Sequence, residues 1–109
     1  MSSMESDAME HFHKTLLVAM KNDAFLMVMD TLVKMAEVMI ERDQKERAVE
    51  ILTISLQYPL RETTRTRAAA LYDDLEAELC PRVILDARRL SDEITLDDLL
   101  AAILGKDVV

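Results

Sequence analysis

A helical periodicity, interrupted once by a polar turn, runs through residues 26–59 and constrains the fold more than any other feature of the chain. On both sides of the turn at residues 43–44, apolar residues recur at intervals of three and four, the spacing of one helix face. Small residues stand where two packed helices would come closest: Ala36 on the first helix, Ala48 and Ser55 on the second. The stretch therefore predicts an antiparallel helical hairpin over residues 24–59.

The rest of the chain carries helical patterns as well. One Gly and two Pro among 109 residues leave few of the tight turns that a β-sheet requires, and so favour long helices. We expect an all-α fold of antiparallel hairpins with about six helices. The predicted helices cover residues 6–21, 24–42, 45–57, 62–79, 81–90 and 95–104.

Short local signals define the predicted helix ends. Asn22 and Asp23 are expected to interrupt the helical structure and to cap the N-terminus of the second helix. Residues 91–93 are expected to form a polar connection. The remaining signals are Pro59 as a stop, Pro81 at the first position of a helix, a capping box from Thr95 to Asp98, and Gly105 as a C-terminal cap.

The chain length and charge narrow the possible partners and location. A length of 109 residues suits one domain, which we expect to span residues 1–109, with a disordered start over residues 1–5. The net charge of −8 argues against nucleic acid and against an anionic membrane as partners. One cysteine cannot form an internal disulfide, and neither a signal peptide nor a membrane span is visible. These features favour a cytoplasmic location.

The hairpin at 24–59 resembles the tetratricopeptide repeat. The residues that carry the resemblance are Leu32, Met35, Ala36, Met39, Ala48, Leu52, Ser55 and Pro59, with the proline one place earlier than the repeat has it. The resemblance implies a non-catalytic scaffold that binds a protein, followed by a degenerate repeat and cap over residues 62–104. A helix that ends near Tyr58 and Pro59, a helix that closes on residues 75–79 with a proline after it, and a final Leu-Asp-Asp-Leu-Leu helix carry a second resemblance. On these cues, residues 46–104 resemble the helical-repeat C-terminal region of bacterial multidomain signalling ATPases and transcriptional regulators, which implies a sensor arm.

In such repeats the first helix of the hairpin lines the concave binding face. The resemblance places that face on Asp30, Val33, Glu37, Ile40 and Glu41. Chaperone-binding relatives carry Lys and Asn at these positions, whereas this set is acidic and apolar. We therefore expect a helix or extended peptide with apolar anchors and basic flanks as the partner.

The exposure of this face separates two interpretations. If it binds a partner, Val33 and Ile40 should be partly exposed in the isolated chain. The alternative is that the first helix folds over the face and that both residues belong to the core. A second apolar stripe that includes Leu26 makes this helix apolar around much of its girth, which is typical of a helix between neighbours.

Two other functions compete with the interaction module. Short repeat arrays leave unpaired end faces, so the chain could instead be a self-assembling structural homodimer. A small enzyme is the weakest hypothesis, since no motif supports it.

Side chains with reactive or ligating groups are present, but their spacing favours structural roles. His11 and His13 are two residues apart, which points their rings to different sides of a helix, so solvated histidines are expected rather than metal ligands. Cys80 is expected to be a buried structural thiol, because no histidine follows His13. The acidic pairs Asp73–Asp74 and Asp97–Asp98 are expected on wet faces. No cofactor and no metal are predicted.

Eight methionines are an unusual number for this length, and five of them lie between Met20 and Met39. Core filling is the favoured interpretation. A soft-metal site or an adaptable binding surface is the alternative.

Overall fold

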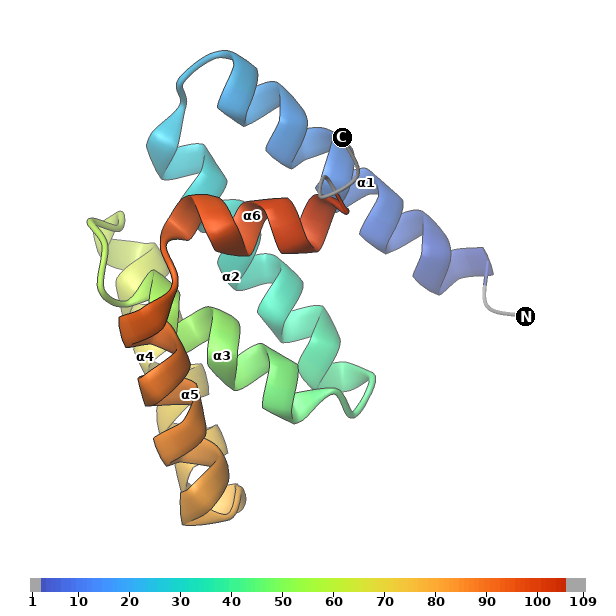
Figure 1. The fold of residues 1–109 in the computed structure, drawn as a ribbon. Coiled ribbons are helices and arrows are strands. Elements are labelled where there is room, and N and C mark those ends of the chain that lie inside the picture. The colour runs from blue at the N-terminus through green and yellow to red at the C-terminus, as the bar shows by residue number, and fades with distance from the viewer. Residues whose placement is uncertain (1–2, 106–109) are drawn as a thin grey trace.

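In the computed structural model the backbone is described for residues 3–105 and the side chains from residue 8 onward. All elements within this range are α-helices, which confirms the predicted all-α fold of about six helices (Figure 1). They are α1 (Ser3–Lys21), α2 (Phe25–Glu41), α3 (Lys45–Ser55), α4 (Glu62–Glu78), α5 (Pro81–Glu93) and α6 (Leu96–Leu104). The expected disordered start at 1–5 falls partly outside the described residues, and its remainder, residues 3–5, lies in α1.

The most extensive helix pair is α2 with α3, as the hairpin pattern predicts (Figure 1). Ala36, Ala48 and Ser55, the small residues of the predicted close approach, are fully buried. Asp43 lies in the turn between the two helices with a φ of 62°, a left-handed conformation that Asp tolerates better than most residues.

Helix α3 is the centre of the molecule. It packs against α2, α4, α5 and α6, and its residues from Ile51 to Ser55 are all buried. Its sequence does not have a strong apolar stripe, because Thr53 and Ser55 interrupt the pattern. The Thr53 hydroxyl is satisfied within the helix, where it donates to the Val49 carbonyl at 2.6 Å.

Helix α1 begins at Ser3 rather than at residue 6, and three further predictions about helix ends differ from the structure by more than one residue or in the residue's role. Asn22 and Asp23 close α1 instead of capping α2: the Asn22 side chain donates to the Val18 carbonyl at 2.9 Å, and Asp23 is left-handed with a φ of 55°. Helix α3 ends at Ser55 rather than at residue 57.

The third difference is in α5, which continues through residues 91–93, where a polar connection was predicted. Ser91 is buried there, because its hydroxyl donates to the Arg88 carbonyl at 2.8 Å and accepts from the Gln57 amide at 2.6 Å. A polar residue whose hydrogen bonds are made inside the protein can thus lie on a buried helix face.

The last helix begins and ends as predicted. Thr95 and Asp98 form a capping box, in which the Thr95 hydroxyl accepts from the Asp98 amide and the Asp98 carboxylate accepts from the Thr95 amide. Gly105 is left-handed with a φ of 67° and ends the helix.

Candidate binding surface

The face of α2 that the repeat resemblance selects is covered by α4. Asp30 accepts a hydrogen bond from Arg61 Nε at 2.8 Å and another from the Thr64 hydroxyl at 2.5 Å. About two turns further along, Glu37 is paired with Arg67, whose Nε donates to the carboxylate at 2.7 Å. The acidic side chains on this face therefore bind helix α4 of the same chain.

The apolar residues of that face are also largely covered by the rest of the protein. Val33 is only 3% exposed, so the predicted partial exposure of Val33 is wrong. Ile40 is half-buried and packs against the core, and Glu41 alone of the five predicted residues is exposed. The alternative interpretation, that the face is core, fits Val33. The residues that lie beside Val33 on this face come from the start of α4 rather than from the first helix. The signal that could have found this is in α4: Arg61, Thr64 and Arg67 recur every three residues and complement the acids of α2.

Exposed apolar side chains gather at a different place, the corner between α1 and α2. Seven large apolar side chains among residues 8–105 are exposed, and six of them lie within residues 17–27. They are Leu17, Val18, Met20, Phe25, Leu26 and Met27, whereas the seventh, Leu85, is on α5. Of these six side chains, Met20 is 39% exposed and Phe25 is 38% exposed.

A groove of about 310 Å³ opens between this corner and the start of α6. We call it the corner groove. Its lining residues are Ala19, Met20, Asp23, Ala24, Phe25, Val28, Leu96, Asp97 and Leu100. Seven of these nine are apolar and two are aspartates, so an apolar floor meets negative charge on both the α1–α2 side and the α6 side.

Tyr58 supports the wall of the corner groove from behind. Its ring lies against that of Phe25, with ring centres 6.3 Å apart and the planes tilted by 53°. Its hydroxyl oxygen accepts a hydrogen bond from the Leu96 amide at 3.1 Å. One side chain just beyond the end of α3 thus contacts both the start of α2 and the start of α6.

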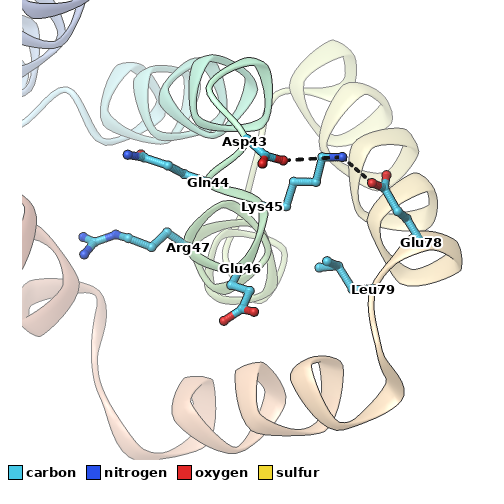
Figure 2. A pocket seen from close by; sticks show the side chains of 7 residues that line it. All are labelled: Asp43, Gln44, Lys45, Glu46, Arg47, Glu78 and Leu79. Atoms are coloured by element: carbon cyan, nitrogen blue, oxygen red, sulfur yellow. Dashed lines mark hydrogen bonds and ion pairs between the residues drawn. The ribbon is translucent and has the colours of Figure 1, made fainter.

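A second, polar hollow of about 460 Å³ lies where the α2–α3 turn meets the end of α4. Lys45 extends across it between Asp43, 3.9 Å away, and Glu78, which accepts its hydrogen bond (Figure 2). Arg47 and Glu46 point away from this lysine (Figure 2). The hydrogen bond to Glu78 raises the pKa of the Lys45 ammonium. A catalytic lysine needs the opposite shift, so this hollow has the chemistry of an ion-pair tether.

The other candidate reactive groups do not come together. Cys80 is exposed at the N-cap of α5, so the prediction of a buried thiol is wrong: the turn between α4 and α5 leaves the residue outside both helices. Asp73, Asp74, Asp97 and Asp98 are exposed, as predicted. His11 is exposed on α1, whereas His13 is half-buried. Within the described residues, no three His, Cys, Asp or Glu side chains are grouped closely enough to hold a metal ion.

The methionines divide between the core and the surface. Met29, Met35 and Met39 are buried, as the core-filling interpretation predicts, while Met20 and Met27 are exposed. Core filling therefore accounts for only part of the methionine content.

Comparison with models of protein families, with curated proteins and with solved structures gave no match for this chain. Over residues 3–105, none of the helices has both the length and the apolar character needed to cross a bilayer.

Proposed function

We propose that this chain is a non-catalytic protein-interaction module, a cytoplasmic helical scaffold or sensor arm of the tetratricopeptide-like kind used in bacterial signalling. The observation that carries the proposal is the corner groove, where Met20 and Phe25 remain exposed beside Leu96 and Leu100 of α6. Large contiguous apolar patches on a monomeric protein commonly mark an interaction site, and six exposed large apolar side chains lie within residues 17–27, in and around this groove.

The chemistry of the corner groove selects the partner. Apolar anchors that enter the groove would supply affinity at roughly 25 cal/mol per Å² of buried apolar surface, before the cost of ordering is subtracted. Asp23 and Asp97 line the same groove. They would attract basic residues on either side of the anchors and would set the rate of association more than its strength. A helix or extended peptide with apolar anchors and basic flanks fits both features.

Two observations support a non-catalytic role. Within residues 8–105, no three of the His, Cys, Asp and Glu side chains are grouped closely enough to hold a metal ion. In addition, the Lys45 ammonium is held in ion pairs with Asp43 and Glu78. Neither a nucleophile with an adjacent base nor a pair of carboxyl groups in contrasting environments is assembled from these residues.

A photo-crosslinking residue at position 20 provides the test. In the source cell, replacement of Met20 should cross-link one protein, and the same replacement at Leu85, which is also exposed but lies on α5, should not. The captured protein is then purified, and its dissociation constant is measured by calorimetry. Met20→Asp should weaken binding by about tenfold or more, since it removes an apolar anchor and adds negative charge.

Leu85→Asp is the matched control and should leave the dissociation constant unchanged. Equal cross-linking at positions 20 and 85, or a Met20→Asp variant that binds as tightly as the parent, would refute the corner groove as the binding surface.

A self-assembling homodimer is the second candidate, and the side chains of Leu17 and Val18 favour it because they are exposed on α1 near the corner. Pairing of two copies through this segment would cover them. Sedimentation equilibrium over a wide concentration range distinguishes the two candidates. A dimer that Val18→Asp dissociates supports self-assembly, whereas a monomer at every concentration removes it and leaves the interaction module.

A further inference from the structure

A cavity separate from the corner groove lies between α1, α2 and α6 and has a volume of about 300 Å³. Three methionines and one histidine line it: Met9 and His13 from α1, Met35 and Met39 from α2. Ile103 of α6, together with Gln44 and Arg47 at the start of α3, completes the lining. Neither a carboxylate nor a thiol is among these residues.

The spacing of the four side chains explains why they meet. Met9 and His13 are four residues apart on α1, and Met35 and Met39 are four apart on α2. Residues at this interval lie one above the other on a single helix face. Because α1 packs against α2, the two pairs face the same space. Metal sites in helical bundles are built in this way, from inward-facing side chains of adjacent helices.

The burial of the four residues distinguishes them from the remaining candidates. Met35 is fully buried and Met39 is 5% exposed, while Met9 and His13 are half-buried at the edge of the core. By contrast, His11 and Met27, on the same two helices, are exposed. The cavity therefore offers thioether and imidazole groups that are partly withdrawn from water. Such an environment suits an ion that is itself weakly hydrated.

We propose that this cavity binds one soft monovalent cation, Cu(I), through the sulfur atoms of Met9, Met35 and Met39 and an imidazole nitrogen of His13. Thioethers are soft, neutral ligands that select Cu(I), and imidazole is compatible with copper. Ca²⁺ and Mg²⁺ require several oxygen ligands, which the cavity lacks. The guanidinium of Arg47 repels every cation at this site, and it repels a divalent ion twice as strongly as a monovalent one.

The proposal is tested with untagged protein that carries Cys80→Ser, because the exposed Cys80 thiol would itself take up Cu(I). Anaerobic titration against a chromophoric Cu(I) chelator measures stoichiometry and affinity. One Cu(I) should bind per chain. Met39→Leu and His13→Ala should each weaken the affinity by about tenfold or more, because each removes one ligand.

Leucine is the chosen replacement because it keeps the apolar volume and removes only the sulfur. Met27→Leu and His11→Ala are the matched controls on the same helices, outside the cavity, and should bind as the parent does. If Met39→Leu loses its helical circular dichroism, the half-buried Met9→Leu decides in its place.

A second measurement separates this site from binding elsewhere. Cu(I) should raise the urea midpoint of the parent, since a ligand that binds only the folded state stabilises it. It should raise the midpoint of Met27→Leu equally, and that of Met39→Leu much less. Affinities that are equal in the parent, Met39→Leu and Met9→Leu would overturn the proposal and leave the four residues as ordinary core packing.

Discussion

The hydroxyl oxygen of Tyr58 accepts a hydrogen bond from the backbone amide of Leu96 at 3.1 Å, across 38 positions of sequence. The Leu96 amide is the first of α6, and the first amides of a helix have no partner within the helix itself. Tyr58 therefore supplies a hydrogen-bond acceptor to the first amide of α6. Through its ring contact with Phe25, it also links α6 to the corner groove.

Tyr58→Phe tests this link. The variant keeps the ring contact with Phe25 and loses only the hydrogen bond, so the free energy of unfolding should fall by about 0.5–1.5 kcal/mol. Urea denaturation measures it. The control is Tyr72→Phe, because the Tyr72 hydroxyl accepts from the exposed Arg88 and its loss should cost less. If the two variants lose the same free energy of unfolding, the hydrogen bond to α6 stabilises the fold no more than the exposed one does.

Ala48 is expected to be intolerant of a larger side chain. It is fully buried on α3, the helix that packs most extensively against α2. Ala48→Phe should overpack this interface and lower the free energy of unfolding by about 1–3 kcal/mol. Ala77, on the exposed side of α4, is the control position, and Ala77→Phe should change stability much less. A fully stable Ala48→Phe variant would contradict the observed pairing of α2 and α3.

Val33 distinguishes core from binding surface. Val33→Asp would place a carboxylate in a nearly closed site on the same face as Asp30 and Glu37, and should cost roughly 3–5 kcal/mol of unfolding free energy. Met27→Asp, on the exposed side of α2, is the control and should fold normally. If Val33→Asp folds with parental stability, the face between α2 and α4 opens readily and could still accept a partner.

Ser55 offers a stabilising substitution. Its hydroxyl is fully buried and has no hydrogen-bond partner among the described residues. An unsatisfied buried hydroxyl costs about 1–3 kcal/mol, so Ser55→Ala should raise the free energy of unfolding by up to about that amount, less any cost of the space left behind. Thermal unfolding measures the gain. The control is Thr53→Val, since the Thr53 hydroxyl is bonded to Val49 and its loss should not stabilise.

Glu50 should make the protein less stable as pH rises. Burial raises the pKa of this carboxyl above 4.5, its usual value, and the neighbouring Arg47 only partly offsets the effect. The folded state therefore holds the proton more tightly than the unfolded state does, and the stabilisation present below pH 4.5 is lost as pH rises through the folded-state pKa. Glu50→Gln should remove this pH dependence and increase the urea midpoint at pH 7. The exposed Glu93→Gln serves as control, and an identical pH profile in both variants would argue against the burial effect.

The sequence by itself determined the features that depend on neighbours three or four positions away. The helix periodicity predicted α1 to α6, and Thr95 with Asp98 located the start of α6, because a capping box is a contact within one turn. The hairpin of α2 and α3 was predictable for a related reason, since a three-residue turn leaves two helices little choice but to pack together. The burial of Ala48 and Ser55 is consistent with that constraint.

Only the tertiary structure decided which apolar and polar groups are covered. An amphipathic pattern gives the direction of a helix face but not the neighbour that meets it. Asp30 and Glu37 were predicted to meet a partner and instead bind Arg61 and Arg67, because α4 returns to α2 after some thirty intervening positions. For the same reason Ser91 could become buried and Met20 exposed: burial is set by contacts between distant segments, and no local pattern in either segment encodes them.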